Sequence, residues 1–299
     1  MPQVLTVRNQ GKKLKKISGS NTMHGLSIVV TDLDGTLLNS CGEISPTDMA
    51  TLKELGSKGI IRVVAKGRSP YSFERVIPKD FPIDYLIFSS GAGAMLWKEK
   101  RILYSTELSC HEVQGVVDEL VLHDVDFMVH EPIPANHRFL YHHTGGDNKD
   151  FLDRLERYKP FATPYIPGVP FGSKASQILA VLPHDVDWFE SLRSRFPELK
   201  VIRATSPLDG HSIWMEIFPQ NVSKAYGIQW ICKELKVKLT EVIAIGNDFN
   251  DLDMLCYVKR SYVVENSPAE LKSVFQTVNS NNNSGFTHAV RLAMNSIQP

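Results

Sequence analysis

The sequence lacks the features that mark several large classes of protein. It has only four cysteines, no run of about eighteen apolar residues and no internal repeat. These absences argue against a disulfide scaffold and against a membrane-spanning chain. Apolar residues make up 42% and charged residues 22%, which excludes a disordered or collagen-like chain. With 299 residues, the chain exceeds the usual size of one compact core, so we expect one large or two smaller domains.

The sequence also lacks an excess of either charge. Its 33 basic residues balance 33 acidic ones, whereas a nucleic-acid-binding protein is normally more basic. Residues 1–22 are an exception, because they carry five basic residues and no acidic one. We interpret 1–22 as a disordered extension before a globular part that starts near Met23. The alternative for this segment is contact with nucleic acid or a membrane surface.

The cysteines do not form a recognisable metal-binding pattern. They are far apart and include no C-x-x-C pair, so we expect no zinc site. Their low number is typical of a reducing compartment, and we expect a cytoplasmic protein. The four positions are Cys41, Cys110, Cys232 and Cys256.

Short apolar runs that end in polar clusters predict a parallel sheet in both outer parts of the chain. Helices are expected between these strands, and two of them should begin at the capping residues Ser45 and Ser223. Near-continuous apolar strands separated by helices indicate a Rossmann-like α/β core. Ligands of such a core bind beyond the carboxyl ends of the strands, where the polar clusters lie. The predicted strands are 27–31, 60–65, 84–88, 241–245 and 261–264.

The middle of the chain has a different pattern. Strand-like segments alternate there with helical ones, and six prolines between 132 and 170 mark loops. We predict an inserted α+β domain at 107–218, with the core formed by 23–106 and 219–299. The predicted strands of the insert are 125–130, 139–141, 177–182 and 214–218, and its predicted helices include 152–158 and 186–196.

The sharpest chemical feature is the pair Asp32 and Asp34, directly after the first predicted strand. Two carboxylates this close repel each other unless a cation lies between them. Magnesium prefers such hard oxygen ligands. Asp32 can then bind the metal with one oxygen and attack phosphorus with the other. Gly35 permits the tight turn that follows. The alternative is an acidic cap on a turn.

These residues resemble the motifs of a known family. TDLDGTLL at 31–38 is similar to the first motif of the haloacid dehalogenase (HAD) superfamily of phosphohydrolases. NVSK at 221–224 resembles the third motif, and GNDFND at 246–251 resembles the fourth. The insert between the second and third motifs resembles a class IIB cap, as in Cof-type sugar-phosphate phosphatases. The resemblance covers nearly the whole chain from about Met23.

The resemblance implies a role for each residue that matches a motif. Asp32 would be the nucleophile, Asp34 the general acid and then base, and Lys224 the cation that neutralises phosphoryl oxygens. The cofactor would be Mg²⁺, held by Asp32, the Asp34 carbonyl and the fourth motif. The alternatives are a solvated lysine and a cluster of acids at a helix N-terminus. The candidate metal ligands are Asp32, Asp34, Asn247, Asp248 and Asp251.

Two positions depart from the family pattern. Lys66 stands in the second motif where a hydroxyl residue is usual, so it either binds phosphate or turns outward and leaves that role to backbone amides. Asn247 stands where an aspartate is usual, which should weaken magnesium binding unless Asp248 or Asp251 contributes more. Arg68 could hold the substrate or pair with an acid. The candidate phosphate- or substrate-binding residues are Gly35, Lys66, Gly67, Arg68, Ser90, Asn250 and Asn266.

From this resemblance we expect a magnesium-dependent phosphatase of a small phosphorylated metabolite, such as a sugar phosphate. The reaction would pass through a phosphoaspartyl intermediate, and the cap would close over the site. A phosphosugar mutase and a catalytically weak protein that binds a phosphometabolite are the alternatives. Binding of nucleic acid through the basic segment 1–22 is a third. We expect no nucleic-acid or membrane partner, and a monomer or weak homo-oligomer.

Overall fold

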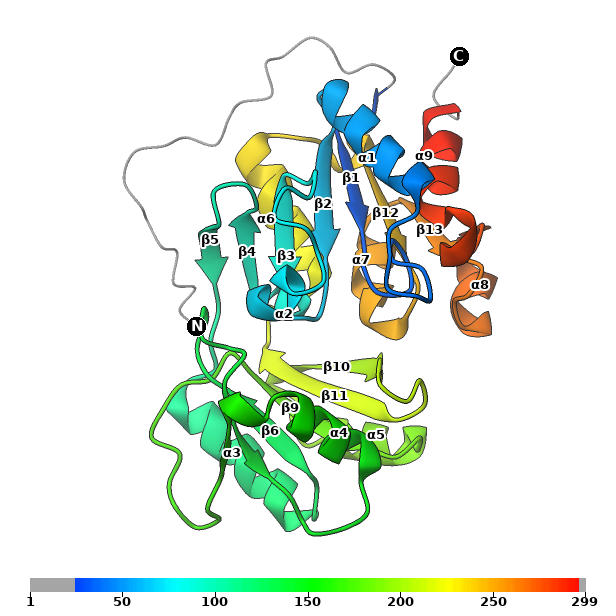
Figure 1. Ribbon diagram of the computed structural model, residues 1–299. Coiled ribbons are helices and arrows are strands. Elements are labelled where there is room, and N and C mark those ends of the chain that lie inside the picture. Colours follow the sequence, from blue (N-terminus) through cyan, green and yellow to red (C-terminus); the bar gives the residue numbers. More distant parts are fainter. Residues whose placement is uncertain (1–24, 296–299) are drawn as a thin grey trace. The chain divides into compact units, whose positions relative to one another are not determined.

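The computed structural model describes residues 25–295, which divide into two compact units (Figure 1). One unit comprises 69–72 and 105–222; the other comprises the remaining described residues, 25–68, 73–104 and 223–295. The expectation for residues 1–22 lies outside the described part. The assignment of the smaller unit as a cap stays a prediction. Within 25–295, no helix has the length and apolar character needed to cross a membrane.

The larger unit is built on an eight-stranded sheet with the order β14-β13-β12-β1-β2-β3-β4-β5. The first six strands in this order run parallel to their neighbours. The predicted Rossmann-like α/β class is therefore confirmed. The strands are β1 (Ile28–Thr31), β2 (Ile61–Ala65), β3 (Tyr85–Phe88), β4 (Gly93–Leu96), β5 (Arg101–Ser105), β12 (Val242–Gly246), β13 (Arg260–Val264) and β14 (Gln276–Val278).

Helices cover this sheet and bury its apolar side chains. Residues of α6 and α7 pack against β1, β2, β3 and β12 in one core cluster, while α1 and α9 contact each other beside the strands (Figure 1). Two helices begin where the sequence predicts. The side chains of Ser45 and Ser223 accept hydrogen bonds from the backbone amides of Asp48 and Tyr226. The helices of this unit are α1 (Pro46–Ser57), α6 (Lys224–Leu235), α7 (Leu252–Tyr257), α8 (Ala269–Val274) and α9 (Gly285–Asn295), while α2 (Pro70–Glu74) has residues in both units.

The core sheet differs from the prediction at both edges, because β4 and β5 at one edge and β14 at the other were not predicted. Strand β4 runs antiparallel to β3, so the sheet is not wholly parallel. Only four residues separate the two strands, which is too few for the crossover that a parallel pair needs. Gly91 adopts a φ of +102° in this link, and Ser89 and Ser90 also have positive φ values. The chain therefore reverses directly after β3.

The smaller unit contains a six-stranded sheet with the order β10-β11-β9-β6-β7-β8. All its neighbouring pairs are antiparallel except β7 and β8. Helices α3 and α5 pack on one face and α4 on the other. This is the predicted α+β pattern. The elements are α3 (Cys110–Leu122), β6 (Phe127–His130), β7 (Phe139–His142), α4 (Lys149–Arg157), β8 (Ala162–Pro164), β9 (Gln177–Leu182), α5 (Val186–Arg193), β10 (Leu199–Thr205) and β11 (Ile213–Pro219).

A buried histidine should make the stability of the smaller unit depend on pH. His130 is 4% exposed; its Nδ1 lies 2.9 Å from the Asn136 carbonyl and its Nε2 lies 3.5 Å from Arg154 Nη2. Because a carbonyl only accepts and a guanidinium only donates, the neutral Nδ1–H ring satisfies both partners. Burial, together with the charge of Arg154, lowers the pKa of His130 to about 3.

Between pH 6.5 and 3, the unfolded chain therefore binds a proton at His130 that the folded chain excludes, so stability falls as pH falls. We expect a loss of about 2 kcal/mol from this group between pH 7 and pH 5. Urea unfolding at several pH values measures it. His130→Gln should remove this contribution to the change of unfolding free energy with pH, and His111→Gln, at an exposed position, should not. An identical slope in His130→Gln would contradict this assignment.

Candidate active site

The predicted motif residues lie at the carboxyl ends of adjacent parallel strands. Asp32 follows β1, Lys66 follows β2 and Asn247 follows β12, while Lys224 opens helix α6. Strand β1 pairs with both β2 and β12, so the loops that follow these three strands meet at the same end of the sheet. The residues come from parts of the sequence that are more than 190 positions apart, yet their side chains are in direct contact.

Lys224 joins two of these motifs. Its Nζ lies 2.7 Å from Asp32 Oδ1 and 2.6 Å from Asp251 Oδ1. Lys224 is 1% exposed, Asp32 is 5% exposed and Asp251 is fully buried. Burial alone would lower the pKa of Lys224, but the charges of Asp251 and Asp32 raise it above its ordinary value. Lys224 is therefore a charged, buried bridge, and the alternative of a solvated lysine is wrong.

The environment of Asp32 disfavours its charged form. Burial raises the pKa of Asp32 to about 7; Lys224 opposes this effect, and the carboxylates of Asp251 and Asp34 add to it. Its Oδ2 accepts no hydrogen bond from any residue in the described range 25–295. One carboxylate oxygen is thus fixed by Lys224, and the other is available to a ligand.

Asp251 also shapes the loop after β12. Its Oδ2 accepts hydrogen bonds from the backbone amides of Asn247, at 2.8 Å, and Asp248, at 3.2 Å. Gly246 makes this approach possible, because a Cβ there would lie 2.7 Å from Asp251 Cγ. Asp251 therefore binds Lys224 with one oxygen and the backbone of the loop 246–251 with the other. This role goes beyond that of an acid that only stabilises a helix N-terminus.

Asp34 is held by two cations. Arg68 donates to both of its oxygens, from Nε at 2.9 Å and from Nη2 at 2.5 Å, and Lys66 Nζ lies 3.4 Å from Oδ2. Although burial alone would raise the pKa of Asp34, Lys66 and Arg68 lower it. Arg68 therefore pairs with an acid, as one of its two predicted roles required. Lys66 is fully buried, so the alternative in which it turns outward is wrong.

Asn247 is fixed by Thr36, a residue that was not predicted to belong to the site. Thr36 is fully buried, and its hydroxyl donates to Asn247 Oδ1 at 2.9 Å. Gly35 adopts a φ of +74°, and a Cβ on it would lie 2.7 Å from Asn247 Nδ2. The signal for Thr36 was its place in the DGT turn, directly after the acidic pair.

Four further predicted residues lie at the same loops without forming one cluster of side chains. Asn266 supports the loop after β1, since its Nδ2 donates a hydrogen bond to the Gly35 carbonyl. Its Oδ1 accepts a hydrogen bond from the Asn281 amide. Ser90 is fully buried and its amide donates to the Lys66 carbonyl. The Asn250 side chain forms no hydrogen bond within residues 25–295. Gly67 lies between Lys66 and Arg68.

The oxygen donors of the site suit a small, hard cation. They are the Asp32 carboxylate, the Asn247 amide oxygen and backbone carbonyls of the loops, a set that fits Mg²⁺ with several retained waters. Within the described residues, no three His, Cys, Asp or Glu side chains gather as a metal site. Asp251 uses both oxygens for the chain, and Asp248 is half-buried beside it. Of the predicted ligands in the first and fourth motifs, this leaves the side chains of Asp32, Asn247 and Asp248 to hold magnesium.

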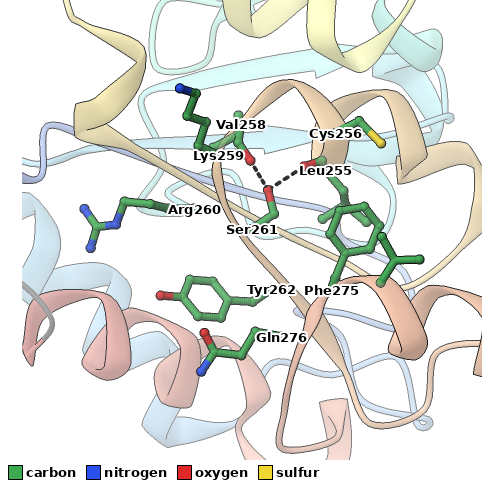
Figure 2. Close-up of a pocket in the computed structure, with 10 residues that line it drawn as sticks. Leu255, Cys256, Val258, Lys259, Arg260, Ser261, Tyr262, Phe275 and Gln276 are labelled. Carbon is green, nitrogen blue, oxygen red and sulfur yellow. Dashed lines mark hydrogen bonds between the residues drawn. The ribbon is translucent and has the colours of Figure 1, made fainter.

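A separate hollow of about 520 Å³ contains none of the predicted site residues. Figure 2 shows Arg260, Ser261 and Tyr262 of β13 at its wall, with Phe275 and Gln276 beside them. Ser261 Oγ donates to the carbonyls of Leu255 and Val258, a hydrogen bond pattern that ties the strand to the end of α7. Arg260 begins β13 and Gln276 begins β14, so the hollow lies at the amino ends of these strands, away from the carboxyl ends that carry the motifs.

Comparison with known sequences identifies the family. Residues 29–290 match the haloacid dehalogenase-like hydrolase family, and the chain therefore belongs to it. A Haemophilus influenzae protein named "Putative phosphatase" is 25% identical over 85% of this chain and 93% of its own length. The similarly named YkrA of Bacillus subtilis is 24% identical over 83% of this chain and 89% of its own.

Solved structures share the fold. BT1666 from Bacteroides thetaiotaomicron, described among the phosphatases of the HAD superfamily, aligns with a TM-score of 0.76 at 18% identity. The alignment covers 94% of this chain and all of BT1666. The HAD subclass IIB sugar phosphatase BT4131 aligns with a TM-score of 0.72 at 15% identity, over 91% of this chain and all of its own. At these identities the likeness shows the fold.

Proposed function

We propose that this hydrolase is a phosphatase of a small phosphomonoester, such as a sugar phosphate or a related metabolite, and that Asp32 is its nucleophile. The observation that carries the proposal is the buried bridge Asp32–Lys224–Asp251. It joins the first, third and fourth motifs at one point and leaves Asp32 Oδ2 available. The Haemophilus influenzae relative is named a putative phosphatase, and BT4131, which has the same fold, is named a sugar phosphatase; both names support a phosphate ester as the substrate.

In the first step, Asp32 Oδ2 attacks the phosphorus atom and the bond from phosphorus to the leaving oxygen breaks. Lys224 keeps Asp32 oriented and offers positive charge to the phosphoryl oxygens. The leaving oxygen needs a proton, and Asp34 is the acid placed two residues from the nucleophile. Because Arg68 and Lys66 hold Asp34 as a carboxylate, protonation requires that the arriving phosphate draws at least one of these cations away.

In the second step, Asp34 takes a proton from a water molecule, which attacks phosphorus and releases Asp32. The paired, ionised form of Asp34 is the form that this step needs. Mg²⁺ would be held by Asp32, the Asp34 carbonyl and Asn247, and when bound it would stabilise negative charge on the transferring group.

We propose further that the smaller unit is the cap that selects the leaving group, and that the protein acts in the cytoplasm.

A panel of phosphomonoesters with Mg²⁺ tests this function, with phosphate release as the readout. Turnover of sugar phosphates that stops with EDTA is expected. Release of an isomeric sugar phosphate without inorganic phosphate would indicate a mutase. Tight binding of a ligand with no turnover, in the wild type and in Asp32→Asn, would indicate a sensor and would contradict the proposal.

Asn247→Asp should tighten metal binding. A carboxylate replaces the neutral amide oxygen while the Thr36 hydroxyl can still donate to it, so the dissociation constant for Mg²⁺ or Mn²⁺ should fall by about tenfold. Titration with Mn²⁺, followed by electron paramagnetic resonance, measures this. Asn283→Asp adds the same charge at an exposed position and should change little. Equal metal affinity in all three proteins would remove Asn247 from the metal site.

A further inference from the structure

The two buried lysines of the site are paired very differently. Lys224 forms two short hydrogen bonds to two carboxylates. Lys66 is fully buried as well, yet the only hydrogen bond that its ammonium group forms within residues 25–295 is the 3.4 Å contact with Asp34 Oδ2. That oxygen already accepts from Arg68 Nε at 2.9 Å. Since an ammonium group has three donors, Lys66 retains donor capacity that the described residues do not use.

Burial makes this incomplete pairing costly. A buried ammonium is unfavourable unless hydrogen bonds and opposite charge compensate for lost water. The Phe73 ring lies 5.0 Å from Nζ and gives a cation–π contact, but a ring face replaces only part of a hydrogen-bonding shell. A ligand that carries several acceptor oxygens would complete the shell.

Unused backbone donors lie on the same two loops. Within the described residues, the amides of Leu33, Asp34 and Gly67 donate no hydrogen bond to the chain. Successive free amides at a turn form a concave binding place for anions. Lys66 therefore belongs to a set of donors that point to one kind of ligand, a tetrahedral oxyanion.

The acidic and basic side chains that contact one another in the site balance without any added ion. Asp32, Asp34 and Asp251 face Lys66, Arg68 and Lys224, and each basic group is in direct contact with a carboxyl group. Burial raises the pKa of Asp32 and lowers the pKa of Lys66, each to about 7, so both can be neutral together and the balance holds. A divalent cation alone adds two positive charges beside three existing cations. A phosphate dianion alone adds negative charge that Lys66 can receive. Bound together, the two ligands leave the balance unchanged, so each should favour the other.

We propose that Lys66 is a phosphate-binding residue that lets the protein bind inorganic phosphate before any metal, and that phosphate and Mg²⁺ then bind cooperatively. The proposal rests on the proposed function, which puts the phosphoryl group beside Asp32. It deepens that function by assigning an order of binding and the residue that sets it. Arg68 remains the partner of Asp34 when Lys66 turns to phosphate.

Isothermal titration with inorganic phosphate in EDTA tests this proposal on the full chain. The wild type should bind phosphate, and Lys66→Met should bind it at least tenfold more weakly. Lys53→Met removes the same charge from the exposed side of α1 and should bind as the wild type does. With Mg²⁺ present, phosphate affinity should rise, and Mg²⁺ affinity should rise by the same factor with phosphate present.

Two results would overturn the proposal. One is a wild type that binds phosphate only when Mg²⁺ is present, and the other is an unchanged phosphate affinity in Lys66→Met. Thermal unfolding of Lys66→Met checks the fold, which should persist because methionine fills the apolar space beside Phe73 and Arg68 still pairs with Asp34. Turnover is measured separately, so hydrolysis without metal-independent binding would refute this inference alone and leave the phosphatase in place.

Discussion

Asp32→Asn is expected to reduce kcat at least about a thousandfold at saturating Mg²⁺. Asparagine has nearly the same shape and can accept the hydrogen bond from Lys224, but its amide is a far weaker nucleophile. Phosphate release from the best ester of the panel measures the effect. Asp80→Asn makes the same chemical change at an exposed position and should retain activity.

The stability of this variant separates a chemical role from a structural one. Burial raises the pKa of Asp32 to about 7, so the folded chain retains a proton there that the unfolded chain loses above about pH 4. The wild type therefore loses stability through Asp32 as pH rises from 4 to 7. Asp32→Asn should be at least as stable as the wild type at pH 8. An active variant would rule out Asp32 as the nucleophile.

Lys224→Met should have the second large effect, on stability and activity together. It leaves Asp32 and Asp251 buried, close together and without the ammonium that bridges them. Removing one partner of a buried ion pair typically costs about 3–5 kcal/mol, and we expect a loss in that range by denaturant unfolding. Activity should fall at least about a hundredfold, because Asp32 loses both its orientation and the neighbouring positive charge.

Adding Asp251→Asn to Lys224→Met should restore part of the stability, since it removes one of the two unpaired charges. Asparagine keeps an oxygen that can accept the loop amides. The exposed Lys233→Met on the same helix is the matched control and should unfold as the wild type does. If Lys224→Met cost no more stability than Lys233→Met, the buried bridge would not be the organising contact of the site.

Five of the eight core strands, β1, β2, β3, β12 and β13, could be predicted because each is a short apolar run with a clear end. The capped starts of α1 and α6 also followed from local sequence, at Ser45 and Ser223. Strand β4 could not be predicted in the same way, because its pairing depends on a reversal in which Ser89 and Ser90 take unusual positive φ values. Helix α3 was not predicted, although the sequence carries a signal for its start, the capping box of Ser109 and Glu112.

The site residues could be found from the motifs, but their pairing could not. No spacing indicates that Lys224 bridges Asp32 and Asp251, because that contact spans 192 residues on one side and depends on the fold. The same holds for Thr36, which meets Asn247 across 211 residues. The burial of Lys66 also required the structure, since a lysine after a strand is usually solvated. Sequence thus gives the chemistry available, while the fold decides which charges meet.

The most direct test of the account is to trap the phosphoryl group on the enzyme. Wild-type protein turning over its best substrate with Mg²⁺ is quenched in acid, reduced with borohydride, digested and analysed by mass spectrometry. A phosphoaspartyl group at Asp32 is converted to homoserine, so the account predicts that residue at position 32 in the peptide. Unmodified Asp32 during turnover, with homoserine at another position or at none, would contradict it.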